Sequence, residues 1–252
     1  LYVNRRALER QLDTLLPLYQ KWGIKGIKFG FVQVGSQKWT SWLHEAIRKA
    51  AKYKMLVDVH DEYRPTGYSR TYPNLLTQEG IRGDEESPFV EHSITTIFTR
   101  MLAGAADNTN CYFTSRVDKM GSHVAQMAKA VCIYSPWQFL FWYDRPVRQV
   151  TDPPKEGEIL EVPELKWFDA LPTTWDESRV LEGDVSKFAT IARKKNNEWF
   201  LGSLNGLQER KLRIACNFLD KDKKYIAEIY TDDTSTDTRT KVRLQVQLAP
   251  LL

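Results

Sequence analysis

The stretch from position 60 to 86 holds the residues of this 252-residue chain that are best suited to chemistry. It opens with His60 and carries three arginines and six acidic residues, namely Arg64, Arg70, Arg82, Asp61, Glu62, Glu79, Asp84, Glu85 and Glu86. Paired carboxyl groups serve general acid–base catalysis and glycoside hydrolysis, and several together can hold a hard cation. Tyrosine, leucine and proline residues are interspersed with these charges. This composition favours a functional segment over the alternative, a solvated loop cross-linked by surface ion pairs.

A buried strand is predicted directly before this stretch, at Met55–Val59. In (β/α) barrels the chemistry is built at the carboxyl ends of the parallel strands. Long connections in compact domains are usually functional. We therefore predict that the chain from His60 to Glu86 forms one long active-site loop.

Several runs of residues in and around this loop resemble glycoside hydrolase family 97. They are Arg-Pro-Thr-Gly, Arg-Thr-Tyr-Pro-Asn and Glu-Gly-Ile-Arg-Gly, with Ile24-Lys-Gly-Ile-Lys-Phe upstream and Tyr134-Ser-Pro-Trp-Gln downstream. Trp175-Asp-Glu then opens a part similar to the C-terminal β domain of that family. The resemblance implies a calcium-dependent hydrolase that cleaves terminal α-linked sugars from an oligosaccharide substrate. It also implies a periplasmic or secreted protein of the Gram-negative bacterial type.

The resemblance also gives roles to individual residues. Glu85 matches the general acid of the family, which lies six residues after a calcium ligand, here Glu79. A general acid must hold its proton near neutral pH and deliver it to the glycosidic oxygen. His60 and Arg64 are predicted to bind substrate. A structural ion pair with Arg82 is the alternative role for Glu79.

The position after His60 departs from the family pattern. Inverting members have a calcium-binding glutamate there that helps to activate water, whereas this chain has Asp61 followed by Glu62. Adjacent residues on an extended chain point to opposite faces, so one of the two is expected to face the site. We predict Asp61 as catalytic base, with Glu62 as the reserve, and Ca²⁺ held by Asp61, Glu79 and Glu85.

Gly30, near the end of the strand predicted at Ile24–Phe31, bears on the stereochemistry. Retaining members of the family carry a nucleophilic aspartate there, in the pattern Val-Lys-x-Asp-Phe, where this chain reads Ile-Lys-Phe-Gly-Phe. This difference resembles the inverting branch and implies an inverting α-glucosidase. A retaining α-galactosidase-like enzyme and a non-catalytic carbohydrate-binding remnant are the alternatives.

The elements that must position these residues alternate between helix and strand. The helical patterns, with their caps and breaks, are predicted from Asn4 to Gly23 with Pro17 inside, along Trp39–Ala50, and within His92–Thr109 and Ser122–Ile133. Such alternation favours parallel strands with right-handed crossovers. We count about four such units, with no strand before the first helix. Residues 1–174 are therefore predicted to be the second half of a (β/α)8 TIM barrel, whose partner is an upstream part of the same polypeptide.

The tryptophans and the C-terminal third of the chain give two further predictions. Trp39 and Trp42 are predicted to be core residues, whereas Trp137 and Trp142 could equally stack on sugar rings. After a proline-rich linker at Thr151–Glu164, alternating patterns predict a small antiparallel β-sandwich over residues 175–252. Its predicted strands are Phe188–Arg193, Trp199–Ser203, Lys211–Phe218, Tyr225–Tyr230 and Lys241–Leu248.

The composition excludes some other classes of function. The net charge is +4, and basic residues are scattered among acids, so we expect no nucleic-acid partner. Apolar runs are too short to span a bilayer, so no membrane association is expected. Whether the chain forms a homo-oligomer is left open.

Overall fold

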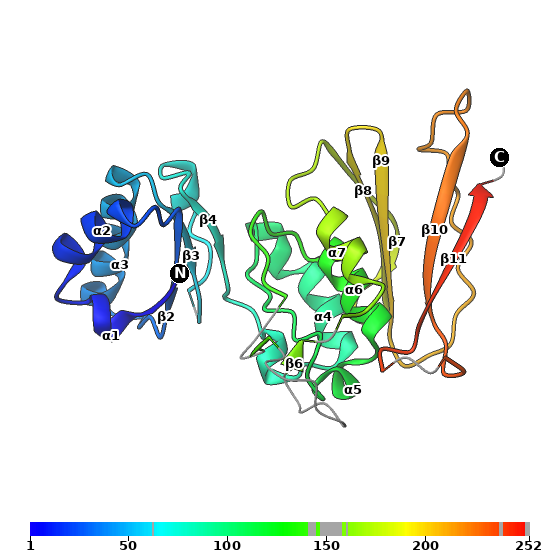
Figure 1. Cartoon of the computed structure of the whole chain (residues 1–252), viewed down its shortest axis with the longest axis horizontal. Helices are drawn as coiled ribbons and strands as arrows, with labels where there is room; N and C mark the ends of the chain where they lie inside the picture. Colours follow the sequence, from blue (N-terminus) through cyan, green and yellow to red (C-terminus); the bar gives the residue numbers. More distant parts are fainter. Residues whose placement is uncertain (62, 141–144, 147–157, 160, 237–238, 250–252) are drawn as a thin grey trace. The chain divides into compact units, whose positions relative to one another are not determined.

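The computed structural model describes residues 1–61, 63–140, 145–146, 158–159, 161–236 and 239–249 (Figure 1). The chain divides into two compact units. The first unit comprises Leu1–Glu86, Thr96–Thr109 and Ile133–Phe139. The second unit comprises Ser87–Thr95, Asn110–Cys132 and Leu140–Leu252. The predicted domain boundary at 174/175 stays a prediction.

The first unit is built on a parallel sheet with the strand order β1-β2-β3-β4. These strands are β1 (Tyr2–Asn4), β2 (Gly26–Gly30), β3 (Leu56–Val59) and β4 (Leu75–Gln78). Two isolated parallel bridges, Gln78 with Ala106 and Thr109 with Phe139, carry the same pairing further along the chain. The predicted α/β class with parallel strands is confirmed for this unit, and the closed barrel stays a prediction.

Helices α1 (Arg5–Leu8), α2 (Leu12–Lys21) and α3 (Gln37–Lys52) connect the first three strands. The predicted cap is present, because the Asn4 side chain accepts a hydrogen bond of 2.9 Å from the backbone N–H of Arg6. Pro17 lies inside α2, and the chain breaks before that helix instead of at the proline. Gly23, with φ of +76°, follows the end of α2 as predicted.

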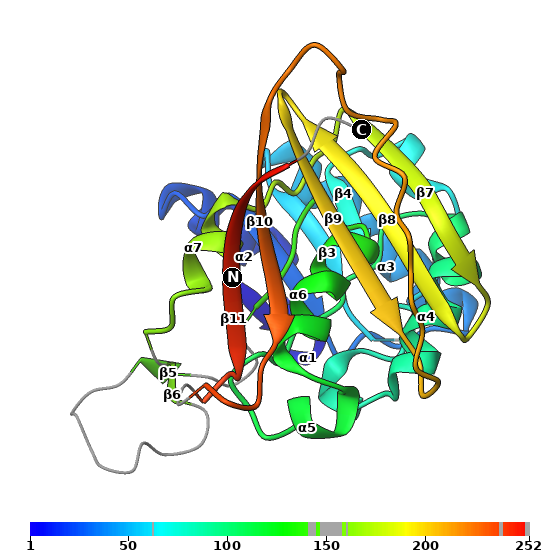
Figure 2. The same cartoon turned by 90° about the vertical axis from the view of Figure 1, so that its right-hand side faces the viewer.

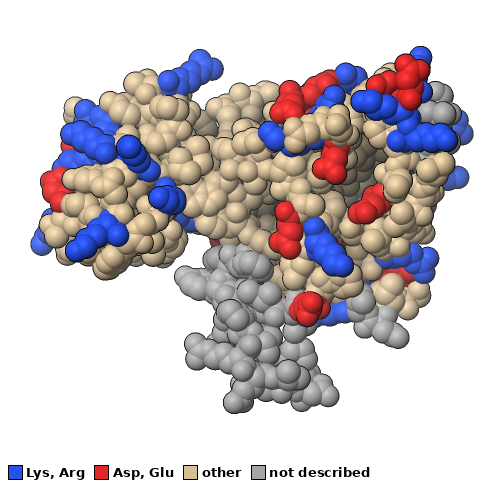
Figure 3. Space-filling model, turned by 45° about the horizontal axis from the view of Figure 1, so that its top comes forward, with Lys and Arg blue, Asp and Glu red and all other residues tan. Residues whose placement is uncertain are grey.

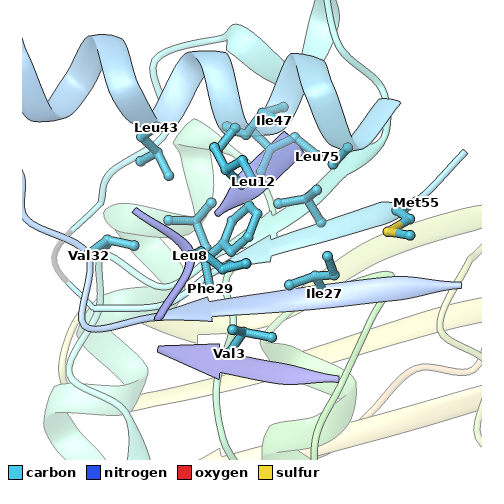
Figure 4. Close-up of a cluster of buried hydrophobic side chains, with 14 of the residues drawn as sticks. Val3, Leu8, Leu12, Ile27, Phe29, Val32, Leu43, Ile47, Met55 and Leu75 are labelled. Carbon is cyan, nitrogen blue, oxygen red and sulfur yellow. The ribbon is translucent and has the colours of Figure 1, made fainter. Parts of the chain in front are cut away.

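Side chains of the sheet alternate between an apolar and a polar face, as the two-residue strand period requires. The apolar face packs under the helices and includes Val3, Ile27, Phe29, Val57, Val59 and Leu75, which contact a core that contains Leu8, Leu12, Leu43 and Ile47 (Figure 4). The opposite face carries Lys28, Asp58 and Thr77, which are aligned by the strand register and buried. The candidate site develops on this polar face.

Two sequence predictions about the first unit are wrong. A strand, β1, does precede the first helix; it spans only three residues, which is too short for a periodic pattern to show. The stretch from His60 to Glu86 is not one loop, because β4 lies within it between the 3₁₀ turns η1 (Tyr68–Arg70) and η2 (Asp84–Glu86). Charged and polar residues surround β4, so the apolar pattern of its four residues was too short to predict a strand.

The second unit contains two antiparallel sheets, as predicted (Figure 2). One is formed by β7 (Glu177–Asp184), β8 (Phe188–Lys195) and β9 (Glu198–Asn205), and the other by β10 (Tyr225–Asp232) and β11 (Val242–Ala249). The predicted strand at Lys211–Phe218 is wrong, and β7 was missed because this outer strand is largely exposed and polar. Whether the sheets form a sandwich stays a prediction.

The remaining elements are short. Their bounds are α4 (Val90–Phe98), η3 (Arg100–Ala103), α5 (Val117–Met120), α6 (His123–Cys132), β5 (Arg145–Pro146), β6 (Glu158–Ile159) and α7 (Leu165–Ala170). On the face drawn in Figure 3, basic and acidic side chains are interspersed over the second unit, whereas the first unit shows mainly basic side chains. Within the described part of the chain, no helix has both the length and the apolar character needed to cross a bilayer.

Candidate active site

The carboxyl ends of neighbouring strands bring the predicted residues together. Gly30 ends β2, His60 follows β3 and Glu79 follows β4. Backbone hydrogen bonds hold these ends side by side: the N–H of His60 donates to Phe29 at 2.9 Å, and that of Glu79 donates to Val59 at 2.8 Å. The sheet thus places Glu79 beside His60, although the two are far apart in sequence.

His60 is the centre of the site. Its Nδ1 lies 2.7 Å from Oδ2 of Asp107, and its Nε2 lies 2.9 Å from Oε1 of Glu85. Nδ1 is also 3.5 Å from Oε2 of Glu79. Burial lowers the pKa of His60, but the hydrogen bonds to Asp107 and Glu85 outweigh burial and raise the pKa to about 10. The ring is therefore an imidazolium at neutral pH, with both nitrogens donating.

Glu79 and Glu85 converge above Gly83. A Cβ atom at Gly83 would lie 2.5 Å from Oε2 of Glu85 and 2.9 Å from Oε1 of Glu79, so only glycine leaves room for both carboxyl groups. Burial raises the pKa of Glu79 to about 9, even though His60 acts against this rise. Burial also acts on Glu85, but the hydrogen bond and charge of His60 outweigh it and lower the pKa of Glu85. The carboxyl pair therefore carries one proton at neutral pH.

Asp61 completes the edge of the site. Its backbone has a positive φ of 67°, and its Oδ2 accepts a 2.8 Å hydrogen bond from the backbone N–H of Val32. One ligand atom each of His60, Asp61 and Glu79 lies within 4.8 Å of the ligand atoms of the other two residues. Such a group can hold a metal ion.

The other predicted site residues are less central. Arg64 is exposed, and its Cα lies next to Gly80, where an added Cβ would be 3.0 Å away from it. Arg82 pairs at 3.2 Å with the exposed Glu86 and not with Glu79, which was the structural alternative. Glu62 lies outside the described residues.

Three buried charges below His60 were missed by sequence reasoning: Lys28, Asp58 and Asp107. The Nζ atom of Lys28 lies 2.7 Å from Oδ2 of Asp107 and 3.5 Å from Oδ2 of Asp58. Burial opposes the charge of Lys28, but the two acids raise its pKa overall. Burial and the charge of Asp107 raise the pKa of Asp58 well above its ordinary value. The signal was available for two of these residues, because each is a charge inside an otherwise apolar strand.

The tryptophans are divided between core and sheet face. Trp42 packs against the apolar core, as predicted. Trp137 lies against Gly26, where an added Cβ would be 2.5 Å from its ring. Gly26 is at the amino end of β2, about 13 Å along the strand from Gly30. Trp137 therefore lies away from the carboxyl edge, and Trp142 lies outside the described residues.

The arrangement can perform acid–base chemistry. A carboxyl pair that carries one proton can deliver it to a leaving group, and a second carboxylate, Asp61, stands at the same strand edge. The imidazolium of His60, whose two nitrogens contact Asp107 and Glu85, can hold the acidic pair in place. These are the components that hydrolysis of a glycosidic bond requires.

Comparison with known proteins agrees with this chemistry. Residues 1–81 match a family model described as "Glycoside hydrolase 97", and residues 174–249 match one described as "Glycosyl-hydrolase 97 C-terminal, oligomerisation". Together the two matches span more than half of the chain. The chain belongs to glycoside hydrolase family 97, which confirms the predicted resemblance.

Two curated relatives carry related names. The chain is 31% identical over 252 residues to "Retaining alpha-galactosidase" of Bacteroides thetaiotaomicron, an alignment that covers 92% of this chain and 36% of the relative. It is 28% identical to "Probable retaining alpha-galactosidase" of Streptomyces bingchenggensis, over 80% of this chain and 31% of the relative. The chain thus spans about a third of the length of these curated relatives.

Solved structures show the same fold. A glycoside hydrolase family 97 enzyme from Pseudoalteromonas sp. strain K8, in complex with acarbose, is 25% identical with a TM-score of 0.77. The match covers 99% of this chain and 43% of that enzyme. A β-arabinopyranosidase is more distant, at 19% identity and a TM-score of 0.64, and shows the fold alone.

Proposed function

We propose that the site cleaves terminal α-linked sugars, with Glu85 as the general acid. The observation that carries this proposal is the pair of carboxyl groups of Glu79 and Glu85, which meet above Gly83 at the carboxyl edge of the sheet and contact His60. Glu85 passes a proton to the glycosidic oxygen as the bond breaks. His60 keeps Glu85 oriented during this step. The names of the two curated relatives support α-linked sugars as the substrate class.

Asp61 is the proposed catalytic base in an inverting mechanism. A retaining mechanism needs a carboxylate that attacks the anomeric carbon, and Gly30 offers no side chain at the end of β2. Water then attacks the anomeric carbon directly, and Asp61 accepts its proton. We propose an α-glucoside as the preferred substrate. The retaining α-galactosidase reaction is the second candidate, because both curated relatives are named for it.

The chemistry of the acidic residues fits a calcium ion. A carboxylate oxygen of Asp61 and one of Glu79 lie within 4.8 Å of each other, and the carboxyl group of Glu85 meets that of Glu79 above Gly83. Hard oxygen ligands of this kind suit Ca²⁺ better than the imidazole of His60 does. We propose that Asp61, Glu79 and Glu85 hold Ca²⁺. The ion would supply positive charge that organises the carboxylates around the sugar.

The wider setting follows from the same proposal. The parallel strands of the first unit are proposed to belong to a (β/α)8 barrel, and the antiparallel sheets of the second unit to a sandwich. Residues 174–249 match a domain described by its role in oligomerisation, which supports a homo-oligomer. An enzyme that takes oligosaccharides from outside the cytoplasm would act in the periplasm or after secretion.

The test is hydrolysis by the full-length gene product that carries this chain. The wild type should hydrolyse 4-nitrophenyl α-glucoside, and 4-nitrophenyl α-galactoside measures the second candidate. Glu85→Gln should lower turnover of an unactivated disaccharide by about 10²- to 10⁴-fold and affect the activated aryl glycoside much less, because a good leaving group barely needs an acid. Glu86→Gln is the matched control, since Glu86 is exposed and pairs only with Arg82 among the described residues.

Two outcomes would count against the proposal in different ways. Failure of the wild type to hydrolyse any α-glycoside, combined with measurable sugar binding, would support a carbohydrate-binding remnant. Equal effects of Glu85→Gln and Glu86→Gln would remove Glu85 from the role of acid.

A further inference from the structure

Two glycines on the polar face of β2 leave space that aromatic side chains occupy. Gly26, Lys28 and Gly30 share this face, because they are two residues apart along the strand. A Cβ at Gly26 would overlap the ring of Trp137, and a Cβ at Gly30 would overlap the phenol of Tyr2, with its hydroxyl oxygen as the nearest atom. The room that Gly30 leaves is therefore not empty, since Tyr2 occupies it.

The sheet register explains how Tyr2 reaches this position. Tyr2 on β1 is the direct neighbour of Lys28 on β2, so their side chains leave the sheet on the same face. Gly30 stands one layer further towards the carboxyl edge, opposite Asn4. The phenol of Tyr2 extends towards the carboxyl edge of the sheet and reaches the level of Gly30. His60 and Glu79 lie at the same level, each at the carboxyl end of its strand. Tyr2 is 51% exposed.

We propose that Tyr2 is a substrate-contacting residue whose hydroxyl hydrogen-bonds the attacking water, and that Gly30 is required because Tyr2 fills its space. This inference rests on the proposed hydrolysis of α-glycosides. The oxygen of the water bonds to the anomeric carbon, Asp61 takes the proton of the water, and Glu85 gives a proton to the departing oxygen. Tyr2 keeps its own proton throughout and only orients the water.

The pairing of Tyr2 with Gly30 predicts a non-additive pair of substitutions. Gly30→Ala should lower kcat of the full-length gene product at least 10-fold, because its methyl group displaces the phenol. In a Tyr2→Ala background the same Gly30→Ala change should cost less than 2-fold, because the phenol is gone. Tyr2→Phe keeps the ring and should lower kcat about 5- to 10-fold with little change in KM, since it removes one hydrogen bond.

Chemical rescue with azide tests the space beside Gly30 independently. Tyr2→Ala opens room beside Gly30 for azide. With an activated aryl α-glycoside, azide bonds to the anomeric carbon as the aryloxide leaves, so β-glycosyl azide should form and be detected by NMR. The wild type and Tyr2→Phe should form none. Tyr53→Phe, a substitution just after α3 and before the amino end of β3, away from the carboxyl edge, is the control and should behave as the wild type.

The outcomes separate this inference from the proposed function. An inactive wild type overturns the proposed function and the inference with it. An active wild type in which Gly30→Ala costs the same in both backgrounds, and in which Tyr2→Ala forms no azide product, overturns only the role of Tyr2. An effect of Tyr2→Phe on KM alone would also contradict an interaction with the attacking water.

Discussion

Replacing Asp107 with asparagine tests the buried charge network most sharply. Asp107 is fully buried and contacts two cations, His60 and Lys28, each at 2.7 Å. The asparagine side chain is neutral, so Lys28 would keep only Asp58 as an acidic partner among the described residues, at 3.5 Å. Removing one partner of a buried ion pair typically costs about 3–5 kcal/mol of unfolding free energy, because the remaining charge is left without compensation.

A surface ion pair of the same length provides the control. Lys49 and Asp13 also lie 2.7 Å apart, but the side chain of Asp13 is 81% exposed. An exposed pair of this kind contributes about 0–1 kcal/mol. Asp13→Asn and Asp107→Asn therefore remove ion pairs of equal length, but Asp107 is buried and contacts two cations, whereas Asp13 is exposed and contacts one among the described residues. The expected difference between them is at least about 2 kcal/mol.

The assay is urea unfolding of the full-length gene product, followed by tryptophan fluorescence, with proton NMR titration of the His60 ring. Asp107→Asn should lower the unfolding free energy by the stated amount and move the pKa of His60 down from about 10, because one of its two main hydrogen bonds to a carboxylate is lost. A loss below about 1 kcal/mol, equal to that of Asp13→Asn, would refute the reasoning. So would an unchanged titration of His60.

Three further predictions concern pH, metal and packing. In calcium-free buffer the stability of the first unit should fall as pH rises from 6.5 towards 10. The reason is that the pKa of His60 is about 10 in the folded protein and 6.5 ordinarily, so the folded state holds the proton more tightly. The stabilisation from this proton, at most about 5 kcal/mol, is complete below pH 6.5 and lost above pH 10. Glu79, with a folded pKa of about 9, acts in the same direction, and a urea midpoint that stays constant between pH 6 and 10 would contradict both assignments. A chelator should lower the melting temperature of the wild type, with recovery on adding Ca²⁺, and should leave Glu79→Gln unaffected; a wild type that ignores both additions would count against calcium. Gly202→Ala should destabilise the second unit by about 1–3 kcal/mol in urea unfolding, because its Cβ would lie 2.6 Å from the carbonyl oxygen of Ala128 on α6, and a neutral result would show that α6 and β9 are packed loosely.

The sequence was most informative where the pattern was local. A helical stripe identified α3, and an apolar run ending in His60 identified β3 with its carboxyl end. The run around Glu79 and Glu85 led to the correct family. Each of these signals spans no more than about twenty consecutive positions, and hydrophobic period and motif spacing can be recognised over that range.

The network below His60 could not be found in this way, because its members meet through the sheet. Asp107 is 47 residues away from His60, and Lys28 is 81 residues away from Thr109, which accepts its 3.2 Å hydrogen bond. The overlap of Tyr2 with Gly30 likewise depends on the register of two strands. Strand β4 was hidden for a different reason, because four residues between polar turns give too little pattern to recognise.

The central claim is that this site hydrolyses an α-glycoside without a nucleophile at the end of β2, where Gly30 stands. Proton NMR of the anomeric signals during early turnover of an α-glucoside by the full-length gene product tests it most directly. Direct attack by water, with Asp61 as base and Glu85 as acid, inverts the anomeric carbon, so β-glucose should be released first and should mutarotate only later. Initial release of α-glucose would contradict the account, because it would require a nucleophile that Gly30 cannot provide.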